Sequence, residues 1–109
     1  KENTREALWD AMQRKEVYAT SGVRMKVRLF GGWGFTSEDA DARDIAAAGY
    51  AKGVPMGGDL PAAPQPGIAP SFLVSALKDP MSGNLDRIQI IKGWIDVDVE
   101  THETIYDVA

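Results

Sequence analysis

The sequence contains no cysteine, a single histidine (His102) and no apolar run close to the length that crosses a bilayer. Without cysteine the chain can form no disulfide, no thiolate metal site and no cysteine nucleophile. Any imidazole-containing site built from this chain must therefore use His102. A bilayer-spanning helix needs ~20 largely apolar residues, so we expect no membrane span, and no signal peptide or transit segment opens the chain.

Basic residues are scarce after residue 28. Residues 1–28 carry seven Lys and Arg against four Asp and Glu, whereas residues 29–109 carry five against twelve. The formal net charge is −4 at pH 7, and no basic cluster is interleaved with aromatic residues. Neutralising phosphates supplies most of the affinity for nucleic acid, so this distribution argues against nucleic acid as a partner.

The length and composition suit one globular domain. The 109 residues are 44% hydrophobic and 26% charged, which is within the range of folded domains. The sequence lacks an initial methionine and opens inside a charged, helix-forming stretch. We therefore expect an internal or C-terminal fragment of a longer protein, with the remainder of that parent chain as its first partner.

The first half of the chain shows one helical pattern and one strand pattern. Asn3 followed by Glu6 has the capping-box spacing, which predicts a helix over residues 4–16 with Asn3 as N-cap. Apolar and cationic residues alternate over residues 23–29, as in a strand with one buried face. The glycine-rich run 31–34 is expected to break this strand, and Thr36 or Ser37 to cap a short helix that reaches residue 48.

The second half is expected to be rich in strands. Five prolines and four glycines in residues 53–70 predict an ordered loop, because proline removes backbone donors. Residues 72–77 are apolar on both faces and predict a central strand. Residues 87–95 and 104–108 predict two more strands, joined by an acidic turn segment that includes His102, so that the three form an antiparallel meander.

These elements predict the α+β class, with one or two helices packed on a small antiparallel β-sheet. The last strand has no predicted partner on its second side, which leaves the sheet with an open edge. An open edge can pair with a strand of another chain, so a homodimer through this edge is one expected assembly.

The acidic segment brings oxygen ligands close to the histidine. Asp96, Asp98 and His102 are candidate metal ligands, since carboxylates and imidazole both bind divalent cations. The segment lacks the turn glycine and the ligand number of a calcium loop, and alternate acids on a hairpin commonly form only its solvated face. From these residues we assign no metal, no cofactor and no catalytic residue to this chain.

Four residues near the first strand are candidate binding residues. Arg24, Lys26 and Arg28 follow one another at two-residue spacing, about 7 Å per step along a strand. They can face an anionic ligand or an acidic partner, or simply pair with acids on a neighbouring strand. Trp33 is flanked by glycines, so it can be displayed for stacking on a sugar or a protein surface, or it can fill the core.

A second set of candidate binding residues lies in the proline-rich segment. It consists of Met56, Gly57, Gly58 and Asp59. The paired glycines can form a backbone nest that binds an anion, and they can equally form a tight turn. The residues themselves leave both interpretations open.

Five segments closely resemble the bacterial family called domain of unknown function 3604: NTREA at 3–7, YATSG at 18–22, FGGW at 30–33, YAKGVPMGGDL at 50–60 and NLDRIQIIKGW at 84–94. The segments occur in the order of the family and cover nearly all of the chain. Segment 50–60 is the most typical of them. Relatives more often have a glycine-containing hairpin turn where this chain has DVDVE at 96–100.

Members of this family look like relatives of the PHP and amidohydrolase metal-dependent hydrolases. The resemblance implies that residues 1–22 are the closing helix and strand of a hydrolase-like domain, and that residues 23–109 are a β-rich accessory region. It also implies that a divalent metal belongs to the parent protein, with its ligands upstream. The chain is therefore expected to be an accessory portion, the alternatives being a binding module for an anionic glycan or protein surface, or a dimerisation piece.

Overall fold

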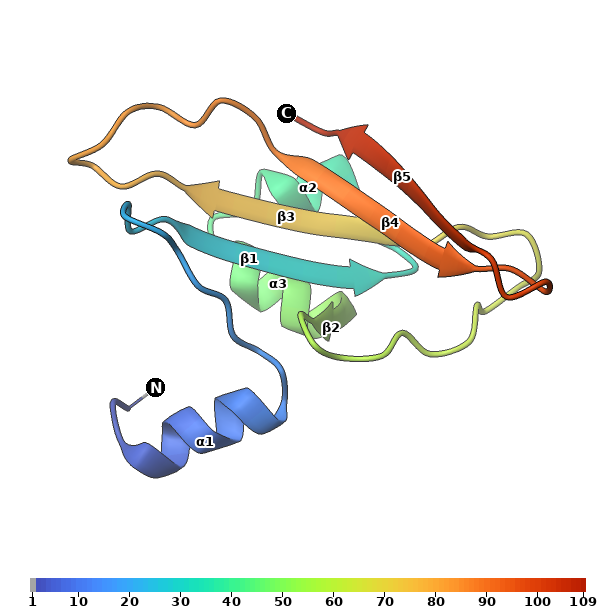
Figure 1. The fold of residues 1–109 in the computed structure, drawn as a ribbon, viewed down its shortest axis with the longest axis horizontal. Helices are drawn as coiled ribbons and strands as arrows, with labels where there is room; N and C mark the ends of the chain where they lie inside the picture. The colour runs from blue at the N-terminus through green and yellow to red at the C-terminus, as the bar shows by residue number, and fades with distance from the viewer. Residues whose placement is uncertain (1) are drawn as a thin grey trace. The chain divides into compact units, whose positions relative to one another are not determined.

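The computed structural model describes residues 2–109 and is drawn in Figure 1. These residues form helices α1 (Arg5–Gln13), α2 (Ser37–Ala40) and α3 (Ile45–Lys52), and strands β1 (Lys26–Gly32), β2 (Gly53–Pro55), β3 (Ser71–Leu77), β4 (Gln89–Ile95) and β5 (Thr101–Asp107). The chain divides into two compact units, which meet in the sequence between Asp79 and Pro80. A few helices with two small antiparallel sheets confirm the α+β class. None of the helices described is long and apolar enough to cross a bilayer.

Helix α1 begins one residue later and ends earlier than predicted. Its N-cap is Thr4 and not Asn3, because Thr4 Oγ1 accepts a hydrogen bond from the N–H of Ala7 at 3.2 Å. After the helix, Lys15 has a left-handed backbone with φ 56°. The N–H groups of Lys15 and Glu16 turn back to carbonyls of the final helical turn, as in a Schellman motif. This motif ends the helix before the predicted last turn.

Strand β1 is the centre of a three-stranded antiparallel sheet of order β2-β1-β3. Exposed and half-buried residues alternate at its start, as predicted, although the strand begins at Lys26. The expected break at the glycines is wrong, because Gly31 and Gly32 continue the strand. A Cβ on Gly32 would lie 2.8 Å from the ring of Phe35, and one on Gly31 would lie 3.3 Å from the ring of Phe72. The glycines therefore serve close packing rather than a turn.

Strand β3 lies at the edge of this sheet, so its predicted central position is wrong. It pairs with β1 from Lys26↔Leu77 to Gly32↔Ser71. The predicted meander is correct only for its last two strands, because β4 and β5 pair antiparallel but form a separate two-stranded sheet without β3. Strand β2 forms inside the segment predicted to be a loop. It is short and lies at an edge, where a proline is tolerated.

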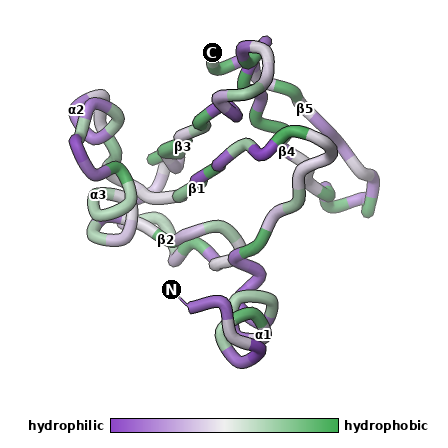
Figure 2. The backbone as a smooth tube through the Cα atoms, turned by 90° about the vertical axis from the view of Figure 1, so that its left-hand side faces the viewer, coloured by the Kyte–Doolittle hydropathy of each residue, from purple (hydrophilic) through white to green (hydrophobic). Residues whose placement is uncertain are grey.

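The core of the first unit lies between the sheet and α3. Phe30 and Leu73 face each other across β1 and β3 and are 1% and 4% exposed. Gly49 of α3 lies over Phe30, and a Cβ there would be 2.4 Å from the ring. Tyr50 packs edge-on against the same ring, with 5.1 Å between centroids. Figure 2 shows α2 and α3 on the same side of these three strands.

The single helix predicted up to residue 48 is two helices, because a second capping residue interrupts it. Thr36 and Asp39 form a capping box at the start of α2, and Asp44 caps α3 by accepting from the N–H of Ala47 at 3.0 Å. Asp39 is 7% exposed, and its carboxylate lies 2.6 Å from the Lys52 ammonium. The Lys52 hydrogen bond, followed by that from the Thr36 N–H, holds the pKa of Asp39 below its usual range.

The second unit is a hairpin. Strands β4 and β5 pair in register from Gln89↔Asp107 to Ile95↔Thr101. His102 lies on β5 opposite Trp94, so its predicted place in a turn is wrong. The turn itself is shorter than predicted and is closed by a hydrogen bond of 3.1 Å from the N–H of Asp96 to the carbonyl of Glu100.

Candidate functional site

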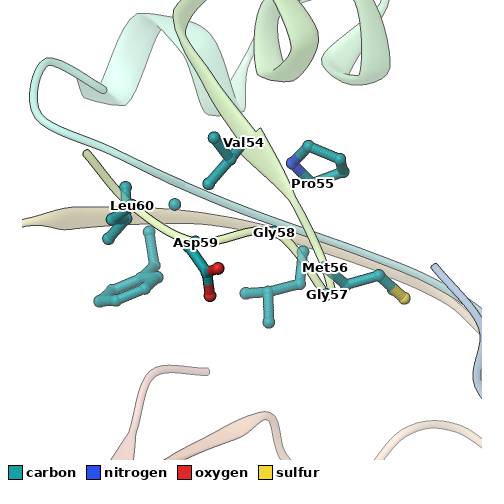
Figure 3. Close-up of a pocket in the computed structure, with 10 residues that line it drawn as sticks. Val54, Pro55, Met56, Gly57, Gly58, Asp59 and Leu60 are labelled. Atoms are coloured by element: carbon teal, nitrogen blue, oxygen red, sulfur yellow. The ribbon is translucent and has the colours of Figure 1, made fainter. Parts of the chain in front are cut away.

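A groove of about 390 Å³ lies on the three-stranded sheet (Figure 3). Its floor is formed by Leu29 and Gly31 of β1 and Phe72 of β3, and its side is formed by residues 54–60, which we call the 54–60 wall. Successive strand residues point to opposite faces, so Leu29 and Gly31 face away from the side on which Phe30 meets α3. The groove therefore lies on the sheet face opposite α3.

The 54–60 wall is shaped by a tight turn directly after β2. The N–H of Gly58 donates to the carbonyl of Pro55 at 3.1 Å, and Gly57 has φ 84°. A positive φ at the third residue is the mark of a type II turn, which favours glycine there. The N–H of Met56 donates to the carbonyl of Leu29 at 3.0 Å, so the entrance to the turn is tied to the central strand. Of the two interpretations of the glycine pair, the tight turn is the one that the structure forms.

The end of α1 rests on this turn. A Cβ on Gly57 would lie 2.3 Å from the carbonyl oxygen of Arg14 and 2.6 Å from Cβ of Lys15. No side chain fits in that space. Gly57 therefore has two reasons to be glycine, its backbone conformation and the close approach of the helix end.

The groove is apolar with one charged residue on its wall. Leu60 and Phe72 close over Gly31, where a Cβ would lie 3.4 Å and 3.3 Å from their nearest carbons. Of the residues that line the groove, Asp59 has the only ionisable side chain. Figure 3 shows its carboxylate beside the apolar side chains. Such a surface suits a ligand with an apolar part and a hydrogen-bond donor or cation next to it.

Trp33 holds the segment that follows the wall. Its Nε1–H donates to the carbonyl of Pro61 at 3.2 Å, and the side chain is half-buried. This contact joins the end of β1 to the proline-rich segment 28 residues later in the chain. Trp33 thus contributes to the order of the loop, beside any stacking role.

Arg24, Lys26 and Arg28, which we call the cationic stripe, are divided in the structure. Lys26 and Arg28 lie on β1, whereas Arg24 precedes the strand and its N–H donates to a carboxylate oxygen of Asp79 at 2.9 Å. Lys26 and Arg28 line a shallow hollow together with Glu16, whose carboxylate lies 4.0 Å from the Arg28 guanidinium. A carboxylate among the cations lowers the positive potential that an anion would meet.

The second unit contains a small cluster of possible metal ligands. Asp96, Glu100 and His102 each offer one ligand atom, and these atoms lie within 4.8 Å of one another. The predicted candidate Asp98 is not in this group, and Glu100 of the same acidic segment takes its place. The sequence alone does not choose between these acids, because the hairpin register decides which of them approach His102.

The side chain of Asp96 is hydrogen-bonded within the hairpin turn and to His102. One carboxylate oxygen accepts from the N–H groups of Asp98 and Glu100 at 2.9 and 3.0 Å, and the other lies 2.7 Å from His102 Nε2. The His102 contact, followed by the Glu100 N–H, lowers the pKa of Asp96. The His102 ring stacks on Trp94 with 5.2 Å between centroids. A cation would have to replace the His102 contact, so the arrangement suits closure of the hairpin better than metal binding.

Six groove residues are not among the predicted binding residues: Leu29, Gly31, Val54, Pro55, Leu60 and Phe72. Strand alternation does place Leu29 and Gly31 on one face, and that signal was available. The approach of Leu60 and Phe72 depends on the path of the loop, which no local pattern encodes.

The fold and the groove define a small α+β protein with an antiparallel sheet, one face of which is covered by helices while the other carries a pre-shaped apolar groove. The chain belongs to the family described as "Protein of unknown function (DUF3604)", whose profile matches residues 1–109. No curated protein and no solved structure matches the chain.

Proposed function

We propose that this chain is an accessory region of a metal-dependent hydrolase, and that the 54–60 wall contacts the substrate at the mouth of the catalytic cleft. The observation that carries the proposal is a coincidence of two properties in one segment. In the family resemblance residues 50–60 are the most typical segment, and residues 54–60 of that segment form the wall of the groove. In this proposal the metal and its ligands belong to other parts of the parent protein.

The shape of the wall supports a role in recognition. Its turn is held by the hydrogen bonds of Met56 and Gly58 and by the contact of Gly57 with the end of α1. A surface that is ordered before it meets a ligand loses little conformational entropy on binding. Asp59 adds one carboxylate to an apolar surface. Small-molecule sites commonly combine a mainly apolar lining with a few polar groups in this way.

The anionic-ligand alternative receives less support. Glu16 lies among the cations of the stripe, and Trp33 already donates its indole N–H to Pro61. The groove carries a carboxylate and no cation among its lining residues. An anionic glycan would therefore meet repulsion at Asp59.

The test uses the intact parent protein and a panel of ester substrates. We expect Leu60→Ala and Asp59→Asn to raise KM roughly three- to tenfold, the effect of losing about 1 kcal/mol of binding, with kcat changed by less than about twofold. Ile68→Ala is the matched control, because Ile68 lies in the same proline-rich segment but does not line the groove. Its KM should equal that of the natural sequence.

Metal content is measured alongside the kinetics. A KM that is unchanged in both groove variants contradicts the proposal. Groove variants that lose both the bound metal and kcat also contradict the proposal. The wall would then support the catalytic centre rather than contact the substrate.

A further inference from the structure

The side of β1 that faces β2 has hydrogen-bond partners beyond the end of that short strand. Beyond the short strand β2, the N–H of Met56 reaches the carbonyl of Leu29. Further along, the hydroxyl of Tyr18 accepts from the N–H of Val27 at 3.2 Å and donates to the carbonyl of Met25 at 3.1 Å. A side-chain hydroxyl thus takes the place of a neighbouring strand at this end of β1.

Strand β3 forms one edge of this sheet. The backbone N–H of Val27 and the backbone carbonyl of Leu29 point toward the β2 side of β1. Backbone groups of successive residues alternate in direction, so those of Phe30 point toward β3, where Leu73 is the paired residue. By the same alternation, the backbone groups of Phe72, Val74 and Ala76 point outward from β3. Among residues 2–109 no strand pairs with this outer edge.

The sequence of β3 contains none of the usual devices that protect an edge. Ser71–Leu77 reads SFLVSAL and has no charged residue, no proline and no glycine. Exposed edges are normally blunted by charges, proline or bulges, because an open row of N–H and C=O groups recruits another strand. Phe72 is 48% exposed and Leu77 60% exposed, so the apolar surface at this edge also lacks cover.

We propose that the outer edge of β3 pairs with β3 of a second copy of this chain, antiparallel and centred on Val74. The outward-pointing residues are symmetric about Val74, as a two-fold axis requires. In this register Phe72 lies opposite Ala76 of the second copy, and Leu73 lies opposite its Ser75. A large side chain thus meets a small one, and Val74 meets its own copy.

Charge favours a second copy at this edge over one at the hairpin. The chain carries a net charge of −4, so two copies repel unless the contact avoids like charges. Strand β3 is uncharged, and its self-pairing brings no like charges together. Strand β5 carries Glu103 and Asp107, and pairing it with itself would bring carboxylates close to carboxylates. The homodimer is therefore assigned to β3 and not to the last strand.

The test exploits the axis through Val74. In sedimentation equilibrium across a concentration series, the natural chain should approach twice its monomer mass. We expect Val74→Lys and Val74→Glu each to weaken the dimer by roughly tenfold or more, because each places like charges opposite each other. An equimolar mixture of the two variants should regain the dimer, since Lys then faces Glu. Circular dichroism confirms that each variant is folded.

Val97→Lys is the control, because Val97 is 96% exposed in the hairpin turn and takes no part in the proposed contact. It should dimerise as the natural chain does. The amides of Phe72, Val74 and Ala76 should become protected from hydrogen exchange as concentration rises. A natural chain that stays monomeric overturns the proposal, and so does a mixture that fails to regain the dimer.

Discussion

Gly57 and Gly67 have the same left-handed backbone, with φ 84°, but different surroundings. Nothing lies within 4 Å of a Cβ on Gly67, whereas one on Gly57 would meet the end of α1. Gly67→Ala should therefore cost only the backbone penalty of about 1–2 kcal/mol. Gly57→Ala should cost at least about 1 kcal/mol more, because the helix end must move. Urea unfolding of both variants measures the difference, and equal costs would show that α1 does not rest on the turn.

The pKa of Asp96 sets a second prediction at this scale. The His102 contact and the backbone N–H groups hold it below the ordinary value of 3.8, which the group regains on unfolding. The carboxylate therefore stabilises the hairpin above pH 3.8, and this contribution is lost as pH falls through the lowered folded value. The amide resonance of Glu100 should titrate with a midpoint below 3.8, and Asp96→Asn should abolish that titration. A midpoint at or above 3.8 contradicts the assigned hydrogen bonds.

Residue-scale features were predictable where a local rule decides them. The Thr36 cap and the alternation of β1 follow from short-range chemistry, whereas the paired glycines allow both a tight turn and an anion nest. The choice of Thr4 over Asn3 as N-cap could not be predicted, because both side chains can cap a helix and the path of the chain selects one. The sequence predicts a break at the two glycines of β1, because their packing against Phe35 and Phe72 does not appear in a local pattern.

At the scale of elements, the edge of β1 depends on one tyrosine. Tyr18→Phe removes the hydroxyl that joins Met25 and Val27 and should destabilise the first unit by about 1 kcal/mol, the usual net worth of a hydrogen bond. The amide of Val27 should lose protection from hydrogen exchange. Tyr106→Phe is the control, with similar exposure and no hydrogen bond shown for its hydroxyl. Equal protection of Val27 in both variants would contradict the edge-capping role.

Strand existence was predicted better than strand pairing. All four long strands occur close to their expected positions, since apolar runs and alternation are local signals. The pairing of β1 with β3 links residues about half the chain apart, across a helical pair and a proline-rich segment. A meander was the simpler expectation because neighbouring strands usually pair, and in this chain the covering of Phe30 by α3 and Leu73 favours the long-range pairing instead.

At the scale of the whole molecule, the first unit has a small core and a shaped groove, and the second is a hairpin. The family membership and the α+β class were both accessible from the sequence, because long motifs and element patterns carry them. The residues that line the groove could be predicted from the sequence only in part. Met56, Gly57, Gly58 and Asp59 were identified as candidates, while the opposing residues of β1 and β3 became visible through the fold.

The proposed accessory role requires that hydrolysis by a longer protein containing this chain does not depend on its single histidine, His102. The most direct measurement compares the 109-residue chain with the intact protein, each as the natural sequence and as His102→Ala, for divalent metal content and ester hydrolysis. We predict that the chain alone neither retains a stoichiometric metal nor hydrolyses the ester, and that the intact protein keeps its activity after the substitution. A 109-residue chain that binds one metal and hydrolyses the ester in a manner abolished by His102→Ala would contradict the account.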